Sequence, residues 1–220
     1  MAETFTVLLD IDGTLVDSNY HHAIAWQRAL RRAGVEVLMA DVHRSIGLGG
    51  DHMIERHAAG VDAPIEDWWH EEFKPLIPEL RPTPGGAALI AHLAESGATN
   101  VYATSGNADD VDTLRAVIGA DRWIRAAVNA NEVASSKPAP DILELAMRRA
   151  GADPGRTILI GDSTWDVQAA NAARLPCIGL TCGGISAAEL AAAGAVEVYE
   201  TPQDLLDHTR TSHLSRLLTT

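Results

Sequence analysis

The sequence predicts an α/β protein, a doubly wound parallel sheet with a small all-helical segment inserted after the first strand. From residue 87 onward, short apolar runs of strand length alternate with segments whose apolar residues recur at helical spacing. This alternation is typical of a parallel sheet covered by helices. Between residues 17 and 80, helical patterns follow one another without a strand candidate. A length of 220 residues suits one core domain with one small insertion.

The first strand is predicted at residues 5–10, an apolar run that is closed by polar residues. From residue 19 to residue 33 the apolar side chains fall on one helical face, and Ser18 or Asn19 is placed to cap that helix. Further helices are expected up to residue 80, where the sequence PTPGG at residues 82–86 indicates a hinge.

The remaining elements alternate in type along the chain. Helices are predicted at residues 87–96, 109–118, 140–150, 166–173 and 187–193, and strands at residues 100–104, 126–129, 157–160, 177–180 and 196–199. We therefore expect residues 1–16 and 81–220 to form the α/β core and residues 17–80 to form a separate helical domain.

The charge of the chain narrows its partners. A formal net charge of −13 disfavours nucleic acid and anionic membrane surfaces, because both are polyanions. A phosphorylated substrate would be repelled as well, so its site must contain local positive groups. The chain has only two lysines for this role, Lys74 and Lys137.

The cysteines and the apolar segments indicate a cytoplasmic protein. Cys177 and Cys182 form no C-x-x-C pair and cannot build a four-cysteine zinc site. The first residues lack the pattern of a signal peptide, and no apolar run approaches the roughly 20 residues of a membrane helix. A reduced, cytoplasmic setting is the expectation.

Polar residues follow the predicted strands, where ligands of doubly wound sheets bind. These residues are Asp10 and Asp12 after the first strand, Ser105 and Gly106 after the strand at 100–104, Lys137 before the helix at 140–150, and Asp162 and Asp166 after the strand at 157–160. We expect them to meet in one crevice.

Such a group of side chains has a definite chemistry. Neighbouring carboxylates repel one another, and a hard cation such as Mg²⁺ relieves this repulsion and screens an incoming phosphate. Ser105, the backbone amides near Gly106 and the Lys137 ammonium can hold phosphoryl oxygens. One of Asp10 and Asp12 can then act as nucleophile and the other as general acid.

These motifs resemble those of the haloacid dehalogenase (HAD) superfamily of phosphatases. The sequence DIDGTLV at residues 10–16 looks like its first motif, and Ser105, Lys137 and the segment from Gly161 to Asp166 match its other three motifs in order. The resemblance extends to about residue 208 and implies a Rossmann-like core. The helical insertion is similar to the cap of the phosphoglycolate phosphatase and β-phosphoglucomutase branch.

The resemblance implies roles for individual residues. Asp10 would attack phosphorus and become an aspartyl phosphate, while Asp12 would protonate the leaving alcohol and then activate water. Mg²⁺ would be bound by Asp10, by the backbone carbonyl of Asp12 and by Asp162, with Asp166 supporting the metal site. Ser105, Gly106 and Lys137 would bind phosphate, although relatives often carry a hydroxyl or Ala at the position of Gly106.

The substrate loop of the cap is expected at Gly47, Gly49 and Gly50, with Arg44 close by. A β-phosphoglucomutase is the main alternative to a phosphatase, but it needs a basic residue on this loop, and the loop has none. Arg44 and Arg56 flank it. The expected substrate is a small phosphorylated metabolite of the phosphoglycolate or sugar phosphate class, and the protein is expected to be a monomer or a homodimer.

Plainer interpretations stay open beside these. Taken singly, Asp12 could belong to a turn, Lys137 could be solvated, and Asp162 and Asp166 could be acids at a helix N-terminus. A non-catalytic phosphate-binding module is the alternative of another class. The remaining ring side chains, His21, His22, His43, Trp68 and Trp69, are more typical of packing or surface residues than of a site.

Overall fold

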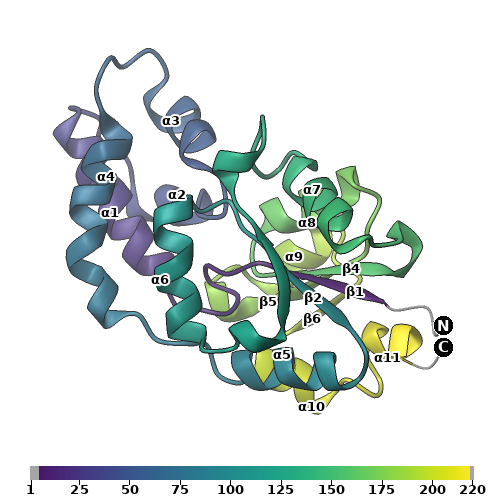
Figure 1. Cartoon of the computed structure of the whole chain (residues 1–220). Coiled ribbons are helices and arrows are strands. Elements are labelled where there is room, and N and C mark those ends of the chain that lie inside the picture. The colour runs from purple at the N-terminus through teal and green to yellow at the C-terminus, as the bar shows by residue number, and fades with distance from the viewer. Residues whose placement is uncertain (1–4, 219–220) are drawn as a thin grey trace.

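The computed structural model describes residues 5–218 and contains one sheet of six parallel strands (Figure 1). The strand order is β3-β2-β1-β4-β5-β6. The strands are β1 (Thr6–Leu9), β2 (Thr99–Ala103), β3 (Ile124–Val128), β4 (Thr157–Gly161), β5 (Cys177–Leu180) and β6 (Glu197–Tyr199). The predicted doubly wound α/β fold is therefore confirmed, with β1 at the centre of the sheet.

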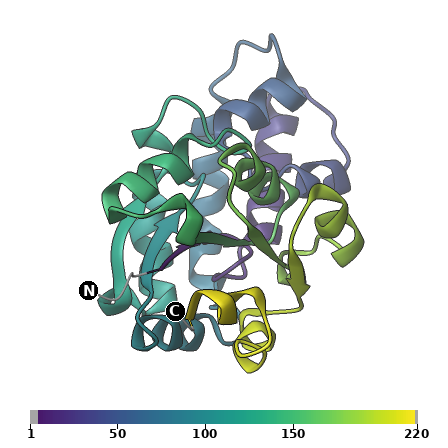
Figure 2. The same ribbon diagram turned by 90° about the vertical axis from the view of Figure 1, so that its right-hand side faces the viewer.

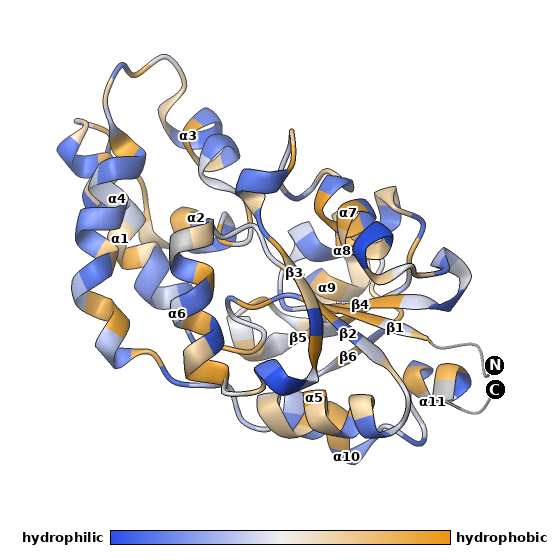
Figure 3. Ribbon diagram, in the orientation of Figure 1, coloured by the Kyte–Doolittle hydropathy of each residue, from blue (hydrophilic) through white to orange (hydrophobic). Residues whose placement is uncertain are grey.

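Helices cover both faces of this sheet, because successive residues of a strand point to opposite sides. In β1, Val7 and Leu9 belong to one apolar cluster and Leu8 belongs to the other. The first face carries α5 (Gly86–Glu95), α6 (Ala108–Ile118), α10 (Pro202–Asp207) and α11 (His213–Leu218), and the second face carries α7 (Asp141–Ala150), α8 (Thr164–Ala172) and α9 (Ala187–Ala193). Strands β1 and β4 are largely orange in Figure 3, as expected for central strands buried on both faces.

The helices between β1 and α5 lie beside the sheet rather than on its faces (Figure 1). They are α1 (Asn19–Arg32), α2 (Met39–Arg44), α3 (Gly50–Ala58), α4 (Ile65–Phe73) and the 3-10 helix η1 (Lys74–Glu79). Helices α1 and α4 pack through stacked rings of Trp26 and Trp69, whose centroids are 5.2 Å apart. We refer to residues 17–80 as the cap. In Figure 2 the cap and the C-terminal helices lie at opposite ends of the molecule.

Several boundaries differ from the prediction for local reasons. Helix α8 begins at Thr164, two residues earlier than expected, because the Ser163 side chain and Asp166 form a capping box there. Strand β3 begins at Ile124 rather than at residue 126, pairing with β2 through an irregular register. Short 3-10 helices occupy connections that the sequence left unassigned: η2 (Asp121–Trp123), η3 (Ala130–Glu132), η4 (Pro154–Arg156) and η5 (Thr181–Gly183). Within residues 5–218, no helix has the length and apolar character needed to cross a membrane.

Candidate active site

Asp10 stands at the carboxyl end of the central strand. Its backbone N–H donates to the carbonyl of Ile160 at 3.0 Å, so the chain stays in register with β4 beyond the last residue of β1. Because β1 and β4 are neighbouring parallel strands, the residues that follow them, Asp10 and Asp162, emerge side by side. Both carboxylates are buried, with 6% exposure for Asp10 and 1% for Asp162.

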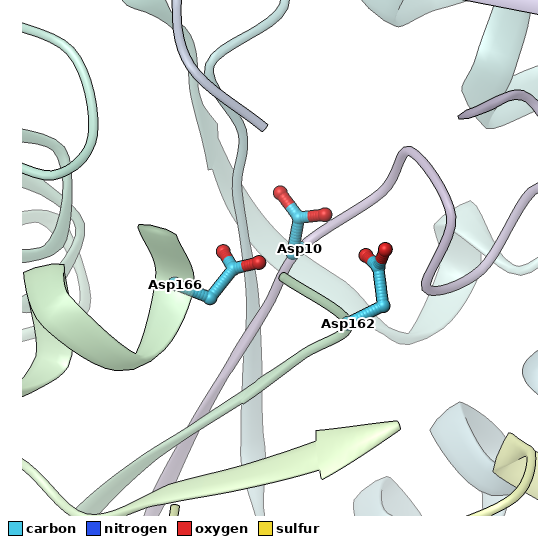
Figure 4. A group of neighbouring side chains, drawn as sticks. All are labelled: Asp10, Asp162 and Asp166. Atoms are coloured by element: carbon cyan, nitrogen blue, oxygen red, sulfur yellow. The ribbon is translucent and has the colours of Figure 1, made fainter. Parts of the chain in front are cut away.

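Three carboxylates converge at this sheet edge (Figure 4). One oxygen from each of Asp10, Asp162 and Asp166 lies within 4.8 Å of the others. The fully buried Lys137 reaches the same place, with its Nζ 2.6 Å from Asp10 Oδ1 and 2.7 Å from Asp166 Oδ1. The structure thus brings together four of the residues that the strand-end argument placed in one crevice.

Burial and neighbouring charges shift the pKa values of the groups in this cluster. Burial raises the pKa of Asp10 to about 7 despite the opposing effect of Lys137, and burial with the neighbouring Asp10 raises the pKa of Asp162. Burial would lower the pKa of Lys137, but Asp10 and Asp166 raise it, so the ammonium stays charged. Three carboxyl groups thus share one ammonium, and their mutual repulsion and burial favour the binding of a further cation.

The donor set fits Mg²⁺, because hard divalent cations prefer carboxylate oxygens. Asp10 and Asp162 are the residues that would hold the ion. Thr14 donates its hydroxyl to Asp162 Oδ1 at 2.7 Å, and Asn19 donates its amide to Asp162 Oδ2 at 2.8 Å, so the orientation of this carboxylate is set by the protein. Asp166 is turned toward Lys137 and accepts from the Ser163 hydroxyl at 2.6 Å, which suits a supporting role.

Asp12 has a different environment from Asp10. His22 Nε2 lies 2.8 Å from Asp12 Oδ1 and is the donor of this pair, since a carboxylate only accepts. The Ser18 hydroxyl donates to the same oxygen at 2.6 Å. Burial would raise the pKa of Asp12, but His22 and Ser18 outweigh it and hold this pKa below its ordinary value. The two aspartates, two residues apart, therefore have pKa values shifted in opposite directions, with Asp10 raised and Asp12 lowered. A nucleophile and a proton donor need the reverse order, and a cation bound beside Asp10 would lower the pKa of Asp10.

His22 was missed by the sequence interpretation, which favoured a packing or surface role. The ring does pack, with its centroid 4.1 Å from that of Phe73, but it also contacts Asp12. A signal was present, because Ser18, His22 and Trp26 are spaced four residues apart and lie on one face of α1.

The predicted helix caps serve the site instead of the helix. Ser18 occupies the N-cap position of α1 but makes no capping hydrogen bond, since its hydroxyl is bound to Asp12. Asn19 links Asp162 to the carbonyl of Gly183, to which it donates at 3.0 Å. The first residues of α1 and its N-cap are therefore hydrogen-bonded to two aspartates of the site, Asp12 and Asp162.

Two of the predicted phosphate donors behave differently. The Ser105 hydroxyl lines the cavity and is buried, with no hydrogen-bond partner among the described residues, so it is available to a ligand oxygen. The Gly106 amide also lines the cavity, but it donates to Thr104 Oγ1 at 3.0 Å. The expectation that this amide is a free phosphate donor is therefore corrected, because the turn after β2 already satisfies it.

The cavity lies between the core and the cap and encloses about 730 Å³, including its open mouth. The core contributes Asp10, Asp12, Thr104, Ser105, Gly106, Asn107, Asp110, Ala130 and Asn131, and the cap contributes His22, Trp26, Ile46, Gly47, Leu48, Gly50, Glu66 and Trp69. Two glycines of the expected substrate loop, Gly47 and Gly50, thus line it.

Gly49, the third glycine, contacts the core directly. Its N–H donates to Ser136 Oγ at 3.1 Å, and a Cβ at Gly49 would lie 2.3 Å from that oxygen. Ser136 precedes Lys137 in the chain, so the cap loop rests on the segment that carries the buried ammonium. Only glycine permits this approach.

The structure does not bring Arg44 to the cavity. Its Nε lies 3.6 Å from Glu189 Oε1, and its backbone carbonyl accepts from Trp165 Nε1 at 2.9 Å. Arg56 lies over the Trp165 ring at 5.6 Å. Both arginines flank the loop in sequence, yet their guanidinium groups are engaged elsewhere, so the prediction of Arg44 as a substrate-loop residue is not supported by this geometry.

Known proteins share these features. Residues 6–174 match the model of the haloacid dehalogenase-like hydrolases. A phosphoglycolate phosphatase of Yersinia pestis is 33% identical over 193 residues, covering 80% of this chain and 81% of that protein. A validoxylamine A 7'-phosphate phosphatase of Streptomyces hygroscopicus subsp. limoneus is 27% identical, covering 79% and 84%. The crystal structure of a hydrolase from Pseudomonas syringae has a TM-score of 0.87 at 30% identity, covering 93% of this chain and 97% of that one.

Proposed function

We propose that this chain, which belongs to the haloacid dehalogenase-like hydrolase family, is a Mg²⁺-dependent phosphatase that acts through an aspartyl phosphate on Asp10. It is a phosphoric monoester hydrolase, as its curated relatives indicate. The observation that carries the proposal is the arrangement around Asp10, a carboxylate that faces the cavity while its Oδ1 is bound to the buried Lys137.

The first half of the reaction transfers the phosphoryl group to the protein. An Asp10 oxygen attacks phosphorus, the bond to the alcohol oxygen breaks, and Asp12 gives a proton to that oxygen. The unpartnered Ser105 hydroxyl can donate to a phosphoryl oxygen, and Lys137 orients Asp10 and favours its ionised form against the effect of burial. A bound Mg²⁺ would offset the charge that the carboxylates and the phosphoryl group share.

The second half returns the enzyme to its starting state. Asp12, now without its proton, takes one from a water molecule, and the water oxygen attacks the phosphorus of the aspartyl phosphate. The bond between phosphorus and Asp10 breaks, and inorganic phosphate leaves. His22 and Ser18 hold Asp12 in a fixed position during both proton transfers, because both bind its Oδ1.

The substrate belongs to the phosphoglycolate or sugar phosphate class in this proposal. The relatives named above act on two different esters, phosphoglycolate and validoxylamine A 7'-phosphate. A phosphosugar mutase would hold a second phosphate on the cap side, and neither Arg44 nor Arg56 lines the cavity. Water is therefore the favoured acceptor.

The deciding experiment measures both possible products. Purified protein with Mg²⁺ receives β-glucose 1-phosphate and a trace of the bisphosphate, while free phosphate and glucose 6-phosphate are followed. Phosphate release from this ester or from p-nitrophenyl phosphate, abolished by chelation and restored by Mg²⁺, supports the phosphatase. Efficient glucose 6-phosphate formation with little free phosphate would overturn it, and undiminished turnover after exhaustive chelation would remove the metal from the proposal.

A further inference from the structure

The cap side of the cavity has an unusual charge balance for a site that receives an anion. Among the described residues that line it, none is Lys or Arg. The single buried ammonium, Lys137, is engaged by Asp10 and Asp166. The one imidazole in the lining, His22, is bound to Asp12. Positive charge is therefore concentrated where the phosphoryl group is transferred, and none is left for the other end of the substrate.

Two further carboxylates, Asp110 and Glu66, line the cavity beside the two aspartates of the reacting centre. Asp110 lines the cavity from the start of α6 with 8% exposure, and its Oδ2 has no hydrogen-bond partner among the described residues. The nearest imidazole, His70, is 3.9 Å away and accepts from Asn107 Nδ2. A buried carboxylate oxygen without a donor is costly, so a ligand that supplies one is favoured.

Glu66 lines the same cavity from the cap, whereas Asp110 lines it from the core. It lies in the first turn of α4 and lines the cavity next to Gly50, where a Cβ would come within 2.8 Å of Glu66 Oε1. The absence of a side chain at Gly50 leaves room for this carboxylate beside the loop. The cap also contributes the apolar side chains of Trp26, Trp69 and Leu48 to the lining.

We propose that Glu66 and Asp110 select substrates whose alcohol part carries hydroxyl or ammonium hydrogen-bond donors and no second anionic group. The donors bind the two carboxylates, the carbon skeleton packs against the tryptophans, and a carboxylate or second phosphate at that position is repelled. This inference rests on the proposed phosphatase function and narrows it, because it favours uncharged or amino sugar and polyol phosphates over phosphoglycolate.

Three esters of nearly equal size test this selection. Phosphoglycolate, 2-hydroxyethyl phosphate and 2-aminoethyl phosphate share the P–O–CH₂ group and differ in the far end, which is a carboxylate, a hydroxyl or an ammonium. With Mg²⁺, we expect kcat/KM for the hydroxyl and ammonium esters to exceed that for phosphoglycolate by at least about tenfold. The ratio of kcat/KM for 2-hydroxyethyl phosphate to kcat/KM for 2-aminoethyl phosphate tells whether the site prefers a neutral or a charged hydrogen-bond donor.

Variants that remove one negative charge show which residues determine the preference between the esters. Glu66→Gln and Asp110→Asn should each reduce the preference for 2-hydroxyethyl phosphate over phosphoglycolate at least about threefold. Asp67→Asn is the matched control, since Asp67 is exposed on the same helix and does not line the cavity. Asp67→Asn removes the same charge from a protein whose formal net charge is −13. Its preference for 2-hydroxyethyl phosphate over phosphoglycolate should stay within about twofold of that of the unaltered protein. Glu66 is exposed, so its variant is expected to fold.

Failure of the inference differs from failure of the proposed function. Phosphoglycolate turnover equal to or faster than that of the other two esters would overturn the inference while leaving a phosphatase. Equal loss of preference in Asp67→Asn would overturn it as well, because surface charge would then be the cause. If no ester were hydrolysed, including p-nitrophenyl phosphate, the phosphatase proposal would fail. Calorimetric measurement of the binding of the three esters would then test the selection by Glu66 and Asp110. Weakest binding of phosphoglycolate would support the selection, and tightest binding of phosphoglycolate would overturn it.

Discussion

The two walls of the cavity are built on different principles. On the core wall, buried charged groups hold one another: Lys137 contacts two aspartates, and Asp162 accepts from two side chains. On the cap wall, aromatic side chains stack on one another, and Trp69 stacks on both Trp26 and Phe73. The glycine-rich loop that contains Gly47 and Gly50 forms another part of this wall. Ionic groups on the core wall have one favourable arrangement, whereas an apolar wall accepts changes of similar volume.

This difference separates reaction from selection. In the proposed function, the core wall contains the groups that bond to phosphorus and move protons, and the rest of the substrate is contacted by the cap wall together with Asp110 of the core. Several contacts join the walls, and two of them are compared below: His22 of the cap binds Asp12, and Gly49 of the cap loop binds Ser136. Substitutions should therefore cost most on the core wall, less at the joining contacts, and least in the loop itself.

The largest effect is expected for Asp10→Asn. The amide has nearly the shape of the carboxylate but is a poor nucleophile, so phosphate release should fall by about a thousandfold or more. Asp17→Asn is the matched control, because Asp17 is exposed and lies outside the cavity lining. Phosphate release and thermal melting are measured together. Activity within about tenfold of the unaltered protein would exclude the covalent mechanism.

Next comes Lys137→Ala, which should harm both catalysis and folding. It leaves Asp10 and Asp166 buried without their cation, and breaking such a pair costs about 3–5 kcal/mol of unfolding free energy. We expect kcat/KM to fall by about a hundredfold and the melting temperature to drop. Lys74→Ala, which removes the other lysine from an exposed position, should change neither. Unchanged kcat/KM with lowered stability would make Lys137 a structural residue only.

A smaller effect is expected for His22→Gln at the first joining contact. Since His22 lowers the pKa of Asp12, its loss should raise that pKa. Asp12 acts as proton donor in its protonated form, so the alkaline limb of the kcat/KM–pH profile should move to higher pH. We expect kcat to fall by about tenfold at neutral pH. His21→Gln, on the same turn of α1, serves as the control. An unshifted alkaline limb is the contrary result and would mean that His22 only packs against Phe73 and Trp69.

The smallest effect is expected for Gly49→Ala at the second joining contact. The added Cβ would overlap Ser136 Oγ, so the cap loop must move away from the core. We expect KM to rise by a few fold with kcat less affected, since the reacting groups are untouched. Gly155→Ala, where a Cβ meets its nearest atom at 3.4 Å, is the control. A loss of kcat as large as that of Lys137→Ala would contradict the separation of the two walls.

The sequence by itself determined the fold class, the order of elements and the core wall. Hydrophobic periods of two and 3.6 residues are local, and they were enough to predict the parallel sheet and its helices. Parallel strands end at one edge, so the residues after β1 and β4 could be expected together before the structure was known. Asp10, Asp162 and Lys137 required no knowledge of side-chain packing beyond that rule.

Only the tertiary structure decided which polar groups are already engaged and what the cap presents to the cavity. Ser18 fits a helix cap by its position, yet it binds Asp12, and the Gly106 amide is satisfied by Thr104. Arg44 pairs with Glu189, whereas Glu66 of the cap and Asp110 of the core line one cavity. These outcomes depend on how the cap packs against the core, and such contacts between residues far apart in the chain leave no periodic trace in the sequence.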